Sequence, residues 1–150
     1  MESKIIVGID EVGLGAVAGP VVSAACFLQA ANSQIKDSKK LSPAQRHHLC
    51  RWIMCNSKWA IGVIDNQDID TSGIVTAWNF SVSEAFNSMI STLPHDKKTY
   101  AIKIDGKRIP TTLENLNIEA IIKGDTKIKE ISAASILAKV WRDNYMINAA

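Results

Sequence analysis

The sequence predicts an α/β domain in which helices flank a five-stranded mixed sheet. Five short runs of β-branched and apolar residues are typical of buried strands, and longer segments repeat apolar residues every three or four positions, as amphipathic helices do. Strands and helices alternate in the second half of the chain, which favours parallel pairing of the last two strands. The predicted strands are residues 5–9, 21–28, 59–64, 100–104 and 118–122, and we expect the first three to pair antiparallel.

Two of the predicted helices have clear signals at their start. Ser42 is a suitable N-cap, Pro43 falls in the first turn and Gln45 completes a capping box, so a helix is expected from there to about Cys55. The clearest amphipathic pattern begins near Gly73, and we interpret its apolar stripe as core. The stripe consists of Ile74, Ala77, Trp78, Val82, Ala85, Phe86, Met89 and Ile90.

Two further segments complete the predicted elements. A last helix is expected over residues 131–149, where alanines and a serine form a small-residue face that permits close packing. An acidic segment contains Asp65, Asp68 and Asp70 but lacks the later ligands of a calcium loop. We therefore interpret it as a solvated loop and helix N-terminus.

Two adjacent carboxylates, Asp10 and Glu11, directly follow the first predicted strand. Neighbouring side chains of a regular strand point to opposite faces, so these two converge only if the strand ends or bends there. Gly13 and Gly15 permit such a bend. Paired carboxylates beside a bare glycine loop suggest a hard cation, while a solvated strand end followed by a hairpin is the alternative interpretation.

Acidic residues follow two more predicted strands, Asp105 after the fourth and Asp125 after the fifth. Parallel strands bring their carboxyl ends to the same edge of a sheet, where functional groups gather. Because the pattern occurs at three strand ends, it favours a metal site over three unrelated solvated acids.

Composition narrows the class of protein. The 150 residues fit one domain, and 47% hydrophobic content is typical of a globular chain. No apolar run approaches the roughly 20 residues of a membrane span, and the N-terminus lacks the plan of a signal peptide, so we expect a cytoplasmic protein without a membrane segment. The three cysteines contain no C-x-x-C pair and are expected to be reduced thiols. His47 and His48, adjacent on a predicted helix, are expected at the surface.

The net charge of +2 is too small to indicate a polyanionic partner by itself, but its distribution is informative. Basic residues repeatedly stand beside the acidic motif positions, which suits a phosphate backbone lying across a metal site. They are Lys36, Lys39, Lys40, Lys97, Lys98, Lys103, Lys107, Arg108, Lys123, Lys127 and Lys129.

Four ordered motifs resemble those of the ribonuclease HII family and together cover about residues 4–146. They are DEVGLGAVAGPVV from Asp10, DSKKL from Asp37, IDG from Ile104, and KGD from Lys123 leading into ISAASILAKVWRD. The resemblance implies a ribonuclease H-like fold. It also implies a metal-dependent endonuclease that hydrolyses the RNA strand of RNA–DNA hybrids, including ribonucleotides embedded in duplex DNA, and leaves a 3′-hydroxyl and a 5′-phosphate.

The resemblance also implies the site residues. The metal-binding and catalytic carboxylates would be Asp10, Glu11, Asp105 and Asp125, which would hold two Mg²⁺ or Mn²⁺ ions about 3.5–4 Å apart. Substrate would be bound by Gly13, Leu14, Gly15, Ser38, Lys39 and Lys40. In the family the glycine loop reads the 2′-hydroxyl, and the serine–lysine segment approaches substrate phosphates.

The chain departs from the family pattern in three places. Leu14 stands where the glycine loop usually has arginine, which removes a fork of charged donors. Lys107 stands where asparagine is usual. The family also continues beyond the last helix into a C-terminal region with a substrate-contacting tyrosine, a role that Tyr145 should not be given. We therefore expect residues 1–150 to form one catalytic domain without that region. We also expect the protein to be a monomer and to bind duplex nucleic acid more weakly than longer family members do.

Three alternatives stay open. The chain could be an inactive, shortened relative that binds nucleic acid without cleaving it, which Leu14 favours and the intact carboxylate set opposes. It could be another metal-dependent phosphoesterase on the same fold. Ribonuclease HIII shares the DEVG-x-G opening, but its additional N-terminal domain has no room before Lys4.

Overall fold

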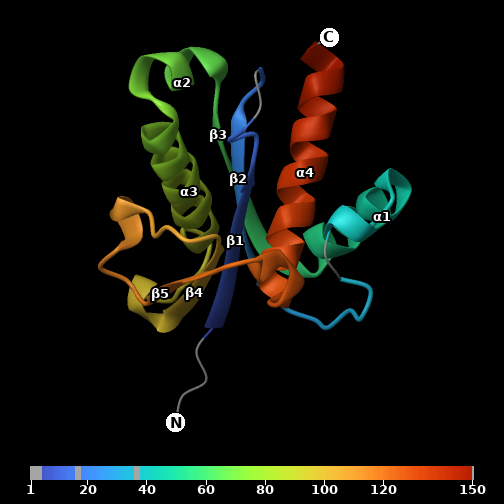
Figure 1. The fold of residues 1–150 in the computed structure, drawn as a ribbon. Helices are drawn as coiled ribbons and strands as arrows, with labels where there is room; N and C mark the ends of the chain where they lie inside the picture. Colours follow the sequence, from blue (N-terminus) through green and yellow to red (C-terminus); the bar gives the residue numbers. More distant parts are fainter. Residues whose placement is uncertain (1–4, 16–17, 36–37, 150) are drawn as a thin grey trace.

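A five-stranded sheet separates two layers of helices in the computed structural model, which describes residues 5–15, 18–35 and 38–149 (Figure 1). The strand order is β3-β2-β1-β4-β5. β1 pairs antiparallel with β2, which pairs antiparallel with β3, while β1, β4 and β5 run parallel. The strands are β1 (Ile5–Val12), β2 (Val21–Leu28), β3 (Ser57–Ile64), β4 (Tyr100–Asp105) and β5 (Ile118–Ile121). The predicted α/β class and mixed sheet are confirmed.

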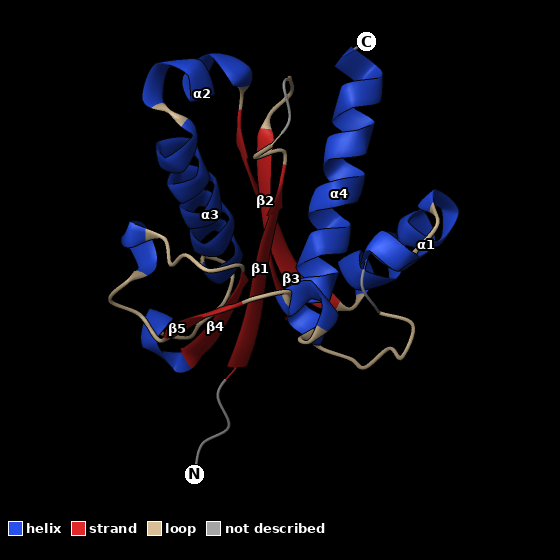
Figure 2. Cartoon of the chain, in the orientation of Figure 1, coloured by secondary structure: helices blue, strands red, loops and turns tan. Residues whose placement is uncertain are grey.

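The two faces of the sheet are covered by different helices (Figure 2). Helix α3 (Ile74–Ile90) packs on one face, and α4 (Lys129–Ala149) with α1 (Pro43–Cys55) packs on the other. Because strand side chains alternate, Val7 and Ile9 of β1 belong to the core beneath α3, whereas Gly8 faces the start of α4.

Helix starts follow the predicted capping rules. Ser42 and Gln45 form the expected capping box of α1: the Gln45 backbone N–H donates to Ser42 Oγ at 3.1 Å, and the Ser42 N–H donates to Gln45 Oε1 at 2.8 Å. The acidic segment contains the expected helix N-terminus, since Asp65 Oδ1 accepts from the Asp68 N–H at 3.0 Å and caps α2 (Asn66–Ser72). The helix extends over Asp68 and Asp70, where a solvated loop was also expected.

Short 3₁₀ turns connect several elements. They are η1 (Ser38–Lys40), η2 (Lys97–Thr99), η3 (Thr111–Leu113) and η4 (Gly124–Thr126). Two of them, η1 and η4, carry residues that the resemblance assigns to the site. Cys26, Cys50 and Cys55 are free thiols, as expected. Within the described part of the chain, no helix combines the length and hydrophobicity that a membrane span requires.

One local prediction is wrong. The first strand does not end or bend after Ile9 but continues regularly through Asp10 and Glu11 to Val12. Pairing with β2 keeps this part of β1 a regular strand: Asp10 lies opposite Ala24 and Glu11 opposite Ser23. The glycine-containing connection begins only after the paired segment has ended, at Gly13 with φ of 100°.

Candidate active site

The carboxyl ends of β1 and β4 place two acidic residues side by side. The parallel register pairs Ile9 with Ile104, so the next residues, Asp10 and Asp105, stand at the same level of neighbouring strands. β5 ends at Ile121, and η4 then carries Asp125 back toward the same edge. The topology therefore gathers three of the four predicted acids at one end of the parallel strands.

Asp10 is the most buried member, with 5% of its surface exposed. Its pKa is raised well above the ordinary value, first by burial and then by the negative charges of Glu11, Asp105 and Asp125. One interaction opposes this rise, because the Glu11 backbone N–H donates to Asp10 Oδ1 at 2.8 Å. The other three predicted carboxylates thus all act electrostatically on Asp10.

Glu11 approaches the other three carboxylates from the opposite face of the sheet. Because β1 is regular there, Glu11 points toward α3 while Asp10 points toward α4. Burial and the charge of Asp105 raise the pKa of Glu11 to about 7, and the nearby Trp78 indole N–H opposes that rise. Glu11 Oε2 and Trp78 Nε1 are both buried, and neither makes a hydrogen bond of good geometry.

Asp105 and Asp125 are linked through the backbone of η4. The Gly124 N–H donates to Asp105 Oδ1 at 2.6 Å, which fastens η4 to the end of β4. Lys123, with φ of 54°, turns the chain into η4 through a left-handed conformation. As a result, Asp125 is buried beside the other acids rather than solvated.

The donor chemistry suits a hard divalent cation. Four carboxylates supply oxygen ligands, and their mutual repulsion marks an excess of negative charge that a cation would neutralise. Among these oxygens, Glu11 Oε2 is buried and makes no hydrogen bond of good geometry. In the described residues, however, no three His, Cys, Asp or Glu side chains are already arranged around one ion position. The acids lie near one another, but their side chains do not surround a single ion position.

The predicted glycine loop lies at the same end of the sheet. Gly13, Leu14 and Gly15 follow β1, and Leu14 lines a hollow of about 350 Å³ together with Glu11 and Asp105. Arg142 of α4 holds the return of this connection: its Nε donates to the Pro20 carbonyl at 3.0 Å and its Nη2 to the Ala18 carbonyl at 2.7 Å.

The predicted phosphate-binding segment is only partly brought to the acids. Lys40 of η1 lines a second hollow, of about 370 Å³, in which Asp125 also takes part. Lys39 is exposed, and the side chain of Ser38 lies outside the described residues, as does Asp37. The structure therefore places Lys40 at the same hollow as Asp125 and leaves the role of Ser38 a prediction.

The basic residues around β4 do not all stand at its acidic end. Lys97 and Lys98 form η2, at the start of the strand, and Lys103 pairs with Glu119 at 2.7 Å. Lys107 and Arg108 follow Asp105 and line the same hollow as Leu14. The expected crowding of cations beside Asp105 is thus limited to these last two among the residues predicted around β4.

Sequence reasoning missed two contributors. Trp78 belongs to the core, as its place in the apolar stripe predicts. Helical periodicity does not reveal, however, that its indole N–H lies beside Glu11. Arg142 gave no signal of its contact with a segment more than a hundred positions away. Asp143, the neighbouring acid, pairs with Lys139 at 3.6 Å, as expected of a helix surface residue.

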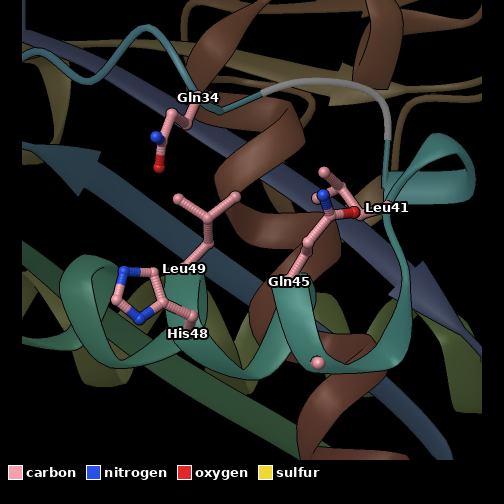
Figure 3. Close-up of a pocket in the computed structure, with 6 residues that line it drawn as sticks. Gln34, Leu41, Gln45, His48 and Leu49 are labelled. Carbon is pink, nitrogen blue, oxygen red and sulfur yellow. The ribbon is translucent and has the colours of Figure 1, made fainter.

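A separate hollow of about 470 Å³ lies against α1 (Figure 3). Gln34, Leu41, Gln45, His48 and Leu49 surround it. Its lining contains no carboxylate among the described residues, so it offers no site for a hard cation. His48 is exposed, as is His47, which agrees with the prediction for both.

The fold and the acids at its strand ends define a ribonuclease H-like protein. The model of the family described as ribonuclease HII matches residues 7–150, and the chain belongs to this family.

Known relatives agree with this assignment. Ribonuclease HII of Ehrlichia ruminantium (strain Welgevonden) is 43% identical over 146 residues, which cover 95% of this chain and 66% of that protein. The chain therefore spans just under two thirds of the length of that relative. Ribonuclease HII from Archaeoglobus fulgidus, solved in its complex with PCNA, superposes with a TM-score of 0.77 at 27% identity, covering 97% of this chain and 76% of that one.

A more distant solved structure shares the fold alone. Bst-RNase HIII in complex with Mn²⁺ superposes with a TM-score of 0.73 at 22% identity, covering 95% of this chain and 53% of that one.

Proposed function

We propose that this chain is the catalytic domain of a metal-dependent endonuclease that hydrolyses the RNA strand of RNA–DNA hybrids and cuts at ribonucleotides embedded in duplex DNA. The observation that carries the proposal is the burial of Asp10 among three further carboxylates at the end of β1 and β4. Membership of the ribonuclease HII family supports it. We further propose that the chain acts as a monomer in the cytoplasm.

Asp10, Glu11, Asp105 and Asp125 would hold the cations, for which Mg²⁺ and Mn²⁺ are the candidates. The Mn²⁺ bound in the ribonuclease HIII structure supports this choice of metal class. When bound, paired divalent cations activate water and stabilise the departing oxygen of an in-line displacement. Because Asp10 and Glu11 are largely withdrawn from water, their attraction for such ions would be screened less than at the surface.

Other residues would position the substrate. Gly13 and Gly15 carry no side chain, so their backbone N–H groups could approach the ribose closely. Lys39 and Lys40 would contact phosphates, with Lys40 beside Asp125. The hydrogen bond from Gly124 to Asp105 would keep Asp105 and η4 in a fixed relation as substrate binds.

One observation favours a second candidate function, binding without cleavage. Leu14 is 36% exposed and puts an apolar side chain on the loop where family members present an arginine. Losing a forked cation weakens recognition of phosphate or base edges without removing the acids. The intact set of carboxylates opposes this candidate.

Incubation with three labelled duplexes distinguishes the candidates. The substrates are an RNA–DNA hybrid, DNA with one ribonucleotide, and all-DNA, each with Mg²⁺ or Mn²⁺ and with EDTA. Cutting of the first two in a metal-dependent manner supports the proposed function. Binding without cutting supports the second candidate, and cutting of all-DNA would show a different phosphoesterase.

A further inference from the structure

The Arg142 side chain binds the backbone of the connection between β1 and β2 instead of an acid. Its Nε donates to the Pro20 carbonyl at 3.0 Å and its Nη2 to the Ala18 carbonyl at 2.7 Å, from the part of α4 that runs alongside the connection (Figure 1). Among the residues that the structure describes, no carboxylate lies within ion-pair distance of the guanidinium. A charged group is therefore devoted to two carbonyls of one short segment.

Both legs of the connection meet at this guanidinium. Gly13 is on the outgoing leg, with φ of 100°, and Gly19 is on the return leg, with φ of 95°. A Cβ built on Gly13 would lie 2.9 Å from Arg142 Nε, and a Cβ built on Gly19 would lie 2.5 Å from Arg142 Nη2. Because neither glycine has a Cβ, the two legs can close around Arg142.

Other packing holds the return leg only on one side. Met146 lies one turn after Arg142 on α4, and its Sδ also stands against Gly19. Behind the leg, a hollow of about 440 Å³ separates Ala18 and Gly19 from the start of α2. The return leg thus has space to move into once its hydrogen bonds to Arg142 are lost.

The same connection leads directly to the carboxylates. Gly13 follows the end of β1, and Leu14 lines a hollow together with Glu11 and Asp105. Since Gly13 packs on Arg142, the position of the guanidinium determines how the chain leaves β1. It therefore also determines where the following N–H groups lie relative to the acids.

We propose that Arg142 is a positioning residue for the glycine loop of the nuclease. It would hold both legs of the connection, so that the N–H groups of Gly13 and Gly15 keep a fixed place beside the carboxylates, and it would not touch the substrate itself. A planar guanidinium can donate to two carbonyls at once, in a geometry that a lysine ammonium does not reproduce. The inference rests on the proposed function.

The first test compares three variants of α4. Arg142→Lys keeps the charge without the fork of donors, and Arg142→Met removes both. The control, Lys139→Met, removes one positive charge from the same helix at a side chain that is 42% exposed and pairs only with Asp143 among the described residues. Far-ultraviolet circular dichroism checks folding. Affinity for a labelled RNA–DNA hybrid is measured in EDTA over a range of salt concentrations, and KM and kcat are measured with Mn²⁺.

Positioning predicts that both Arg142 variants lower kcat by about tenfold or more, because a small misplacement beside the reacting bond is costly. Affinity in EDTA should change by less than about threefold, and the slope of log affinity against log salt by less than about half a unit. Lys139→Met should change kcat by less than about threefold. A parent-like kcat in Arg142→Lys, with a slope lowered by about one in Arg142→Met, would show a phosphate contact and overturn the proposal.

The second test observes the connection without substrate or metal. NMR order parameters of the Gly13, Leu14 and Gly19 amides are measured in EDTA for the parent and the three variants. We expect values of about 0.85 in the parent and in Lys139→Met, and a fall below about 0.6 in both Arg142 variants.

Order parameters that stay at the parent values in the Arg142 variants would overturn the positioning role, whatever happens to kcat. A parent chain that does not cut the hybrid would overturn the proposed function. The order parameters would then still decide whether Arg142 holds the connection in place.

Discussion

At the scale of single residues, the site forms where the neighbouring strand β4 ends, and β1 itself does not bend there. Asp10 and Glu11 point to opposite faces of a regular strand, yet the charge of Asp105 raises the pKa of both. This is possible because β4 ends at Asp105 and the sheet is open beyond it. Neighbouring acids on one strand can therefore act together if they stand where the adjacent strand stops.

Glu11 should make the stability of the metal-free protein depend on pH. Its folded pKa of about 7 lies above the ordinary value of 4.5, so between these two pH values the folded state binds more protons than the unfolded chain. The contribution of Glu11 to the free energy of unfolding is therefore fully present below about pH 4.5 and is lost as the pH rises through 7. A pKa difference of that size corresponds to roughly 3 kcal/mol.

The variant Glu11→Gln removes this titration. In EDTA its Tm should exceed that of the parent by several degrees at pH 8, and the difference should shrink toward pH 5, as thermal melts in matched buffers will show. Glu84→Gln, on the exposed face of α3, is the control. A Tm difference between Glu11→Gln and the parent that is constant with pH would contradict the assigned titration.

Asp125 and Asp143 separate a site acid from a surface acid. Asp125 is buried and contributes to the raised pKa of Asp10, whereas Asp143 pairs with Lys139 on the outside of α4. We expect Asp125→Ala to slow single-turnover cleavage of hybrid by about a hundredfold or more, because a cation ligand is lost. Asp143→Ala loses a surface pair worth about 0.3–0.5 kcal/mol and should keep nearly the parent rate. The opposite order in one assay would reverse the assignment.

Leu14 is expected to limit recognition of single ribonucleotides. A charged hydrogen bond contributes about 1.5–3 kcal/mol, so Leu14→Arg should raise cleavage of the single-ribonucleotide duplex by roughly tenfold to a hundredfold and that of the hybrid by less. Leu14→Lys supplies charge without the planar fork and should gain less. Both substrates are measured in one buffer, since phosphate contacts depend on salt. No gain on either substrate would show that Leu14 is not the limiting residue.

At the scale of elements, one glycine sets the distance between β1 and α4. A Cβ built on Gly8 would overlap the backbone of Glu130 and Ile131, in the first turn of α4. Because η4 directly precedes α4, this close approach also positions Asp125 near Asp10.

Gly8→Ala should therefore push α4 outward. Overpacking of this kind costs about 1–3 kcal/mol, and we expect a fall in Tm of roughly 2–4 °C per kcal/mol together with slower cleavage. Gly15→Ala is the control for stability, since a Cβ there meets no atom within 4 Å. An unchanged Tm for Gly8→Ala would show that α4 is free to shift.

Most elements could be predicted because their signals are local. The apolar run of β2, the capping box at Ser42 and the stripe of α3 each lie within a short segment, and the structure confirms all three. The extension of β1 through Asp10 and Glu11 could not be read locally, because pairing with β2 decides where that strand ends. For α2 the helix N-terminus was expected and Asp65 caps it, but the length of the helix beyond that cap was not.

At the scale of the whole molecule, the positions of the acids could be predicted but their surroundings could not. Three strand ends indicated Asp10, Asp105 and Asp125 because parallel strands share an edge. The contacts of Arg142 with the carbonyls of Ala18 and Pro20 join distant parts of the chain, so no spacing reveals them. A site assembled from several elements is thus visible in sequence only through those members that share a strand-end pattern.

The gathering of four acids should make the molecule less stable without metal and more stable with it. Asp10 is 5% exposed, and its charge is opposed first by burial and then by Glu11, Asp105 and Asp125. In Asp10→Asn the amide oxygen can still accept from the Glu11 N–H while the repulsion is relieved. At pH 8 in EDTA, we expect this variant to be more stable than the parent by about 1–3 kcal/mol, or a few degrees in Tm.

Divalent metal should reverse this order, because it binds the folded parent and not the unfolded chain. At 100 times the dissociation constant such binding adds about 2.7 kcal/mol to the parent, whereas Asp10→Asn, lacking one ligand, should gain less and should not cleave hybrid. Thermal melts with EDTA, Mg²⁺ and Mn²⁺, followed by a cleavage assay on the same samples, measure both effects. If Asp10→Asn melts below the parent in EDTA, then Asp10 stabilises the fold through its own contacts and its burial is not a cost carried for the metal site.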